Sequence, residues 1–251
     1  MNPEDLLLLA PAFVAGLLVL LTHVPLGRQV LARGIIFLDL AIAQLAATGA
    51  LLTMLVVHDH DAWEAQAGAG VAALAGALLL HAAERRWPEI QEALIGSTFV
   101  LAATLALLLL AADPHGGEAL RDALAGQILW VSWEQLPALL TTTVIVLLLT
   151  RSGRGPLLAF YLPFALAVTV AVQLVGVYLV FSSLILPALA VRHVASPRRA
   201  LALALLTGAG GYALGLTVSF VADLPAGPAC TWGLAIAALV TATTTGLLAR
   251  R

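Results

Sequence analysis

Residues 175–199 read VGVYLVFSSLILPALAVRHVASPRR, an apolar run that ends in a short basic turn. An α-helix needs about 20 apolar residues to cross a hydrocarbon core about 30 Å thick, and this run is close to that length. The rest of the chain repeats the pattern, since 61% of its 251 residues are hydrophobic and 10% are charged. The mean hydropathy is +1.02. These features predict an all-α, polytopic membrane helix bundle with one transmembrane domain over residues 1–251 and no soluble domain.

The apolar runs predict nine membrane-spanning helices, which cover residues 6–24, 35–57, 66–82, 93–111, 133–150, 157–171, 173–191, 199–221 and 229–249. The stretch 157–191 also permits an interpretation with eight spans, in which it forms one long, bent helix. As one α-helix it would rise roughly 52 Å, well beyond the bilayer core. Because Arg flanks both of its ends, we favour two short helices that reverse near Gln173.

All twelve basic residues of the chain are Arg, and eleven of them fall on one side of this map. Short cytoplasmic loops of membrane proteins carry an excess of Lys and Arg, so this side is predicted to be the inside. The N-terminus is then outside and the C-terminus inside. The exception is Arg121, and the eleven are Arg28, Arg33, Arg85, Arg86, Arg151, Arg154, Arg192, Arg198, Arg199, Arg250 and Arg251.

The turns on the opposite side are acidic and carry histidine. The densest set is His58, His60 and Asp61 in the turn 58–64. Imidazole and carboxylate groups are preferred ligands of divalent first-row metals such as Zn and Mn, so this turn is a candidate site of metal capture. The alternative is that these loops are simply polar, with acidic residues outside complementing arginines inside. The net charge of −2 gives no indication of a nucleic-acid partner.

Asp39 is the clearest ionisable residue within a predicted span. A charge at membrane depth costs a few kcal/mol, so it is a candidate for function by default. Gln44 and Thr48 share a helix face one turn apart. Asp39 is rotated by about 140° from Gln44, at about 100° per residue, so one straight helix does not present both side chains to one ion. The alternative is that Asp39 caps a neighbouring helix or pairs with Arg33 or Arg28.

The quoted run contains two expected helix-breaking residues, Gly176 at its start and Pro187 near its end. Proline bends a helix because it lacks the N–H group and its ring clashes with the preceding turn. The turn that follows carries a set of polar side chains that a cytosolic motor could push against: Arg192, His193, Ser196, Arg198 and Arg199. The alternative is a plain proline kink beside a turn whose charge only orients the protein.

The chain contains no P-loop, no Ser/His/Asp set, no HExxH and no dinucleotide fingerprint. It is therefore predicted not to be an enzyme, and any ATP use must come from a partner. The single cysteine, Cys230, excludes an internal disulfide and a Cys-rich metal cage.

Four segments resemble the ABC-3 family of metal-transport permeases, in the same order along the chain: residues 27–49, 92–99, 176–192 and 216–228. The resemblance implies a homodimer in the bacterial inner membrane with cytosolic ATP-binding subunits beneath it. It also implies an extracytoplasmic metal-binding protein that delivers Zn, Mn or Fe. The metal is then the transported substrate, and no cofactor is bound permanently.

The chain departs from the family pattern in residues 27–49, where the family usually has an Asp and a Ser-His pair. Gln44 stands at the position of the family's His, and Asp39 lies one place earlier than the family's Asp. Glutamine is a neutral oxygen ligand and a poorer zinc ligand than imidazole. The neighbouring residues follow the family pattern, so the segment is typical of a subgroup.

These observations predict a permease subunit that moves a divalent transition metal inward at the expense of ATP bound elsewhere. Zinc is the favoured cargo, with manganese or iron as alternatives. One rival is a secondary carrier driven by an ion gradient, which should have buried charged residues in several spans. A second rival is an intramembrane enzyme, which would need a catalytic pair at membrane depth.

Overall fold

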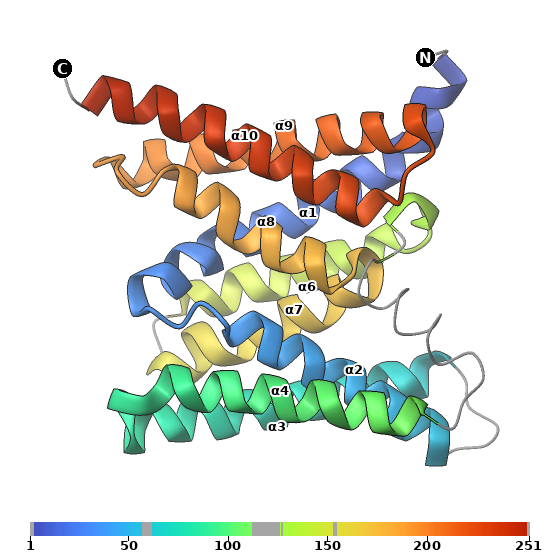
Figure 1. The fold of residues 1–251 in the computed structure, drawn as a ribbon, viewed down its shortest axis with the longest axis vertical. Helices are drawn as coiled ribbons and strands as arrows, with labels where there is room; N and C mark the ends of the chain where they lie inside the picture. The colour runs from blue at the N-terminus through green and yellow to red at the C-terminus, as the bar shows by residue number, and fades with distance from the viewer. Residues whose placement is uncertain (1–2, 57–61, 112–125, 127, 153–154, 250–251) are drawn as a thin grey trace.

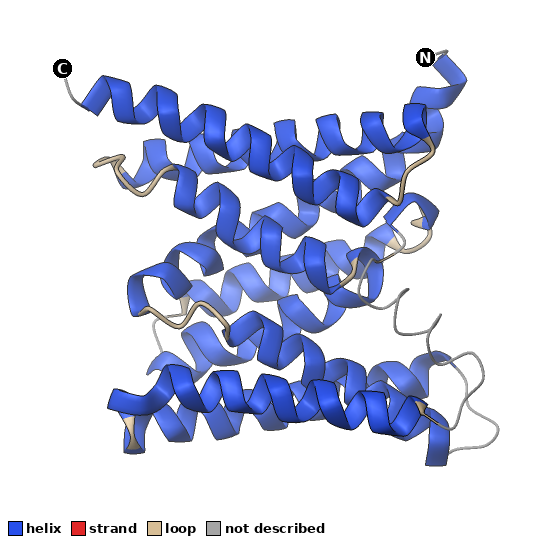
Figure 2. Cartoon of the chain, viewed as in Figure 1, coloured by secondary structure: helices blue, strands red, loops and turns tan. Residues whose placement is uncertain are grey.

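The computed structural model describes residues 3–56, 62–111, 126, 128–152 and 155–249. Within these ranges the chain forms nine α-helices. Figure 2 shows helices and loops and no strand in the described part of the chain. The helices are α1 (Pro3–Arg33), α2 (Leu38–Val56), α3 (Ala62–Arg86), α4 (Gln91–Leu110), α6 (Leu136–Arg151), α7 (Leu162–Val175), α8 (Val177–Ala190), α9 (Pro197–Ala222) and α10 (Ala226–Ala249). Three short helical turns accompany them: η1 (Pro88–Ile90), η2 (Ile128–Trp130) and η3 (Leu157–Tyr161).

The predicted polytopic helix bundle is confirmed. By length and composition, seven helical segments in the described part of the chain could cross a membrane, and α6 and α8 are shorter apolar helices. Each of the nine predicted spans coincides with one helix. The largest difference is in α1, which continues to Arg33 although residue 24 was the predicted end. The helix accommodates Pro25, and Leu26 and Val30 beyond it are fully buried, so packing favours its continuation.

The helices lie roughly along one direction, with α3 and α4 at one edge of the bundle and α9 and α10 at the opposite edge (Figure 1). Helix α2 packs against both α3 and α4, and α1 packs against α8 and α9. Helix α1 begins at one end of the bundle and α10 ends at the other (Figure 1), as an odd number of spans requires. Arginines occupy the last turns of α1, α3 and α6, which end at the same end of the bundle.

The stretch 157–191 forms two helices, so the interpretation as one bent helix is wrong. Gly176 separates α7 from α8 and has φ 80° and ψ 163°. This conformation is readily available only to glycine, because a side chain would clash with the backbone. The two helices run in opposite directions (Figure 1), and the reversal falls at Gly176, three residues after the predicted position near Gln173.

Small residues allow α9 and α10 to pack closely. A Cβ atom on Gly211 would lie 2.7 Å from the Leu234 Cα atom, and one on Gly215 would overlap the backbone of Cys230. Membrane helices commonly use small residues at such contacts, because the absence of side chains lets the two backbones approach. The α9–α10 pair therefore depends on glycine along one helix face.

Replacing Gly211 by leucine should destabilise the protein, because the added side chain must push the backbone of α10 away. Overpacking of this kind typically costs about 1–3 kcal/mol. Gly210 provides a matched control, since a Cβ atom there would meet no atom within 4 Å. Thermal unfolding in detergent should show a lower Tm for Gly211→Leu and little change for Gly210→Leu. Equal effects of the two substitutions would contradict this account of the packing.

Candidate functional site

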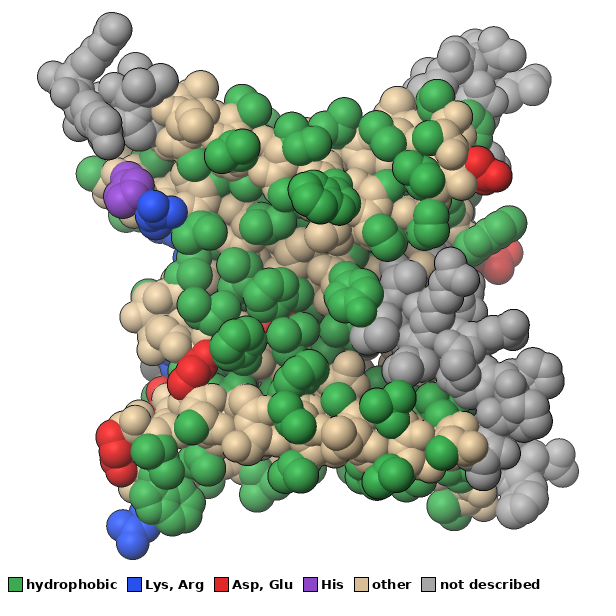
Figure 3. Space-filling model, viewed as in Figure 1, with side chains coloured by type: hydrophobic (Ala, Val, Ile, Leu, Met, Phe, Trp, Pro, Cys, Tyr) green, Lys and Arg blue, Asp and Glu red, His purple; other side chains and the backbone are tan. Residues whose placement is uncertain are grey.

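A groove with a volume of about 750 Å³ runs between the α2–α4 pair and the α8–α10 pair. We call it the central groove. Its walls are mainly apolar, and hydrophobic side chains dominate the same face of the molecule in Figure 3. The described residues that line it are Leu40, Gln44, Phe99, Ala103, Leu107, Val177, Tyr178, Phe181, Ser182, Leu186, Pro228, Thr231 and Trp232.

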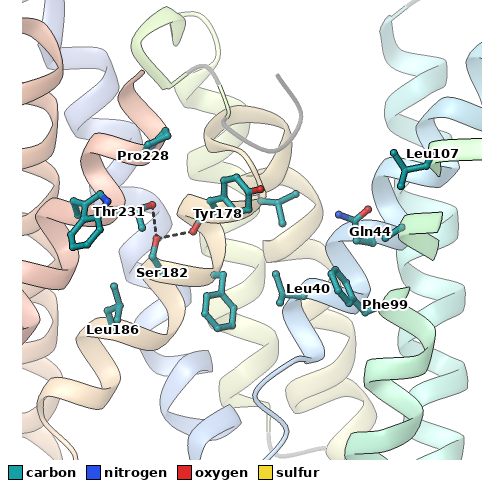
Figure 4. A pocket seen from close by; sticks show the side chains of 13 residues that line it. Leu40, Gln44, Phe99, Leu107, Tyr178, Ser182, Leu186, Pro228 and Thr231 are labelled. Carbon is teal, nitrogen blue, oxygen red and sulfur yellow. Dashed lines mark hydrogen bonds between the residues drawn. The ribbon is translucent and has the colours of Figure 1, made fainter. Parts of the chain in front are cut away.

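Five of the lining side chains carry polar groups: Gln44, Tyr178, Ser182, Thr231 and Trp232. The hydroxyl oxygens of Ser182 and Thr231 lie 3.2 Å apart and join α8 to α10 by a hydrogen bond. Ser182 Oγ also lies 2.8 Å from the Tyr178 carbonyl oxygen, to which it can donate. Gln44 on α2 and Tyr178 on α8 point toward one another across the groove (Figure 4). The lining residues therefore provide one amide, three hydroxyl groups and one indole N–H, all of them neutral.

The structure brings Gln44 to the central groove and leaves Asp39 outside it. Leu40 and Gln44, one helical turn apart, both line the groove. Asp39 is rotated on α2 by about 100° from Leu40 and by about 140° from Gln44. Its side chain is buried, and neither carboxylate oxygen has a hydrogen-bond partner among the described residues. The separation expected from the sequence is therefore confirmed.

Asp39 is the second residue of α2 and lies at the end of that helix where Leu40 borders the groove. Backbone N–H groups at a helix N-terminus favour a negative charge, typically by 0.3–1 kcal/mol. The alternative in which Asp39 pairs with Arg33 or Arg28 is not found among the described residues, where both arginines have other partners. Arg33 lies 3.5 Å from Glu84 and stacks over the Phe160 ring, whereas Arg28 donates to the Pro197 carbonyl oxygen at 3.2 Å.

The predicted capture site of His58, His60 and Asp61 lies outside the described residues. Within the described residues, no group of three or more His, Cys, Asp or Glu side chains is placed to hold a metal ion. His23 is buried beside Thr22, with 3.0 Å between its Nδ1 atom and the Thr22 hydroxyl oxygen. His81 lies 3.5 Å from Glu84. Both histidines therefore have local contacts within the bundle.

The turn between α8 and α9 is short, as expected from the sequence, but Pro187 does not break α8, which continues through it to Ala190. Within the turn the Val194 N–H donates to the Val191 carbonyl oxygen at 2.9 Å. Ser196 is the N-cap residue of α9 and Pro197 its first residue, but the Ser196 side chain makes no capping hydrogen bond. The turn is thus compact and defined at both ends.

Four polar side chains at this turn are exposed and therefore accessible to a partner. Arg192, His193, Arg198 and Arg199 are all exposed. The Arg28 guanidinium contacts the Pro197 carbonyl oxygen and so links the turn to α1. A push on the turn would therefore act on α8, α9 and α1 together.

Sequence reasoning missed a polar cluster at the basic end of the bundle. Glu84 at the end of α3 pairs with Arg33 and His81, and the Gln91 side chain donates to the Tyr161 hydroxyl at 2.9 Å. Tyr161 ends the π-helical turn η3, and its ring centroid lies 4.9 Å from that of His81. Turns of π-helix often occur at functional sites. The spacing of these residues along the chain gave no signal, since they come from four separate segments.

The described residues form an apolar bundle of nine helices, an architecture that defines a membrane-integral protein. The family model of the ABC 3 transport family matches residues 5–162 and 157–245, and the chain belongs to this family. The family resemblance in the sequence is therefore confirmed. A search of curated proteins finds no match.

Two solved structures share the fold. PsaBC from Streptococcus pneumoniae, in complex with Fab, has 22% identity and a TM-score of 0.69, over 95% of this chain and 93% of that chain. An inward-facing structure described as an ABC transporter of metal-chelate type has 18% identity and a TM-score of 0.65, over 99% of this chain and 89% of that chain. Both align over nearly the full length, so they share the whole architecture of the bundle.

Proposed function

We propose that this chain is the membrane-spanning permease of an ATP-driven importer of divalent transition metal. The observation that carries the proposal is the family match over nearly the whole chain, on a bundle that has a groove between two helix pairs. Zinc is the first cargo to test, and manganese and iron are the alternatives. Asp39 and Gln44 belong to the proposed metal path, Gln44 in the central groove and Asp39 beside its inner end.

The proposed partners follow from the same family. A cytosolic ATP-binding subunit would dock at the turn between α8 and α9, where Arg192, His193, Ser196, Arg198 and Arg199 lie. An extracytoplasmic metal-binding protein would deliver the cargo from the opposite side. A second copy of the chain would complete the permease as a homodimer in the inner membrane.

The described residues favour ATP over an ion gradient as the energy source. Among the described residues, Asp39 is the one carboxylate whose side chain is fully buried. A carrier driven by an ion gradient needs ionisable groups at membrane depth in order to couple the two fluxes, and such groups usually occur on several helices. Among the described residues, the buried ionisable side chains Asp39 and His23 are too few to couple the two fluxes in the usual way.

Uptake into proteoliposomes tests the proposed function. We expect radioactive zinc to enter only when the permease is reconstituted with its ATP-binding subunit and binding protein and is supplied with ATP. A proton or sodium gradient without ATP should not replace that requirement. Uptake by the permease alone under such a gradient would support the secondary carrier instead.

Cysteine labelling tests the proposed orientation, with the C-terminus of α6 inside. In a Cys230→Ala background, Ser152→Cys should react with an impermeant thiol reagent only after the cells are opened. Trp133→Cys, before the start of α6, should react in intact cells. Ser152 and Trp133 are both exposed, so access through the membrane decides the result. Labelling at position 152 in intact cells would reverse the orientation.

A further inference from the structure

The helix face of α2 that borders the central groove lacks charged metal ligands. Leu40 and Gln44 occupy the two groove-facing positions one turn apart. The carboxylate of this segment is one residue earlier, at Asp39, and the rotation of the helix turns it out of the groove. Because the carboxylate is at Asp39, one residue before the groove-facing position, that position holds the apolar side chain of Leu40.

The remaining walls do not replace the missing ligands. Among the described residues that line the groove, none is Asp, Glu, His, Cys or Arg. The polar groups are the Gln44 amide, the Trp232 indole N–H and the hydroxyls of three further residues, Tyr178, Ser182 and Thr231. The Ser182 and Thr231 hydroxyls already bond to one another. Zinc in proteins is bound by thiolate, imidazole or carboxylate groups. A bare divalent ion would lose its water here without receiving ligands of that strength.

The size and chemistry of the groove fit an organic ligand. Pockets for small molecules have volumes of about 300–1,000 Å³ and combine apolar walls with a few polar groups. The central groove, at about 750 Å³, falls in this range and is far larger than one ion requires. Tyr178 and Trp232 are 50% and 72% exposed, and they provide aromatic surfaces at the groove for a planar or partly apolar ligand.

We propose that the metal enters the central groove inside a small organic chelator, which fills its coordination sphere and presents a neutral surface to the protein. The Gln44 amide and the groove hydroxyls then hydrogen-bond to the periphery of the chelate, and the aromatic side chains contact its apolar parts. This inference rests on the proposed function and specifies the form of its cargo. Asp39 lies outside the groove and is not part of this contact set.

A double-label experiment tests the form of the cargo. Proteoliposomes with the complete transporter receive either radioactive zinc alone or the neutral complex zinc bis-histidinate, in which the histidine carries tritium. We expect ATP-dependent uptake of the complex to exceed that of free zinc by roughly tenfold, the discrimination that a few specific contacts provide. Tritium should enter together with zinc. Equal uptake of both forms, with histidine left outside, would overturn the inference and leave metal import intact.

Restoring charged ligands to the groove wall provides a second test. The double substitution Leu40→Asp with Gln44→His places a carboxylate and an imidazole one turn apart on the groove face of α2. We expect uptake of free zinc to rise by at least roughly tenfold, because even residues that only hold metal ligands in place alter metal affinity on that scale. No gain of free-zinc uptake by a variant that keeps the wild-type elution profile and ATPase activity would contradict the inference.

Substitution of Trp232, an aromatic residue that lines the groove, provides a third, independent test. Trp232→Ala should lower uptake of zinc bis-histidinate by roughly tenfold, as loss of a central aromatic contact often does. Trp130→Ala is the matched control, because Trp130 is 82% exposed and does not line the groove. Equal uptake of the complex by the two variants would overturn the inference. Uptake of neither probe by the wild-type transporter would instead contradict the proposed metal import.

Discussion

Inserting two glycines after Val194 should uncouple ATP hydrolysis from uptake while the permease still inserts and binds its ATP-binding subunit. The turn joins α8 to α9 through few residues, and the Val194 N–H bonds to the Val191 carbonyl oxygen. In the native protein, the turn would transmit a movement of the ATP-binding subunit to both helices. Two inserted glycines would make the turn flexible, so the movement would no longer reach α8 and α9. We expect uptake to fall at least about tenfold, a loss of about 1.4 kcal/mol in the coupled step. ATPase activity and zinc uptake in the same proteoliposomes provide the measurement.

The charge of the turn needs a separate control. Arg198→Ala with Arg199→Ala removes two exposed arginines without changing the length of the turn. If these residues only orient the protein, this variant keeps its ATP-binding subunit and its uptake. If they contact that subunit, the complex becomes weaker and more sensitive to salt, because exposed charge pairs are screened. Normal uptake by the glycine insertion would contradict the coupling role of the turn, whatever the arginine variant does.

The sequence predicted the bundle well because membrane spans leave a strong local signal. Each span is a long apolar run, and its ends are marked by Arg, Pro or polar residues, so nine helices could be placed. The sequence did not predict the end of a helix correctly where packing against other helices decides that end. Helix α1 passes through Pro25 because the residues beyond it are buried by other helices. The reversal between α7 and α8 needed a residue that tolerates φ 80°, which identifies Gly176 better than the nearby Gln173.

The candidate site was only partly predictable. Helix periodicity correctly separated Asp39 from Gln44, because rotation along one helix depends on sequence spacing alone. The groove itself was not predicted, since it forms between α2, α4, α8 and α10, which are far apart along the chain. Tyr178 and Ser182 belong to the most distinctive apolar run, but nothing in that run distinguishes the groove face from the lipid face.

Asp39→Asn should abolish most uptake and leave the stability of the permease unchanged or higher. The Asp39 side chain is buried, and its carboxylate oxygens have no hydrogen-bond partner among the described residues. At the centre of a span a charge costs about 2.5–3.5 kcal/mol on insertion scales, and the position of Asp39 at the N-terminus of α2 lowers this cost without removing it. Asparagine keeps the shape and removes the charge, so it relieves this cost. We expect uptake to fall at least about tenfold.

The comparison with another carboxylate separates a specific role of Asp39 from a general effect of lost charge. Glu92 is half-buried in the first turn of α4, and its Oε1 atom accepts a hydrogen bond of 3.4 Å from the Phe37 N–H. Glu92→Gln removes one negative charge near the same end of α2 and should change uptake little. Because no structural partner among the described residues offsets the cost of burying Asp39, we expect the carboxylate to have a function. In the proposed path, that function is to accept hydrogen bonds from the cargo as it leaves the groove. Normal uptake by Asp39→Asn, together with a raised Tm, would instead make Asp39 a helix-terminal residue without a part in transport.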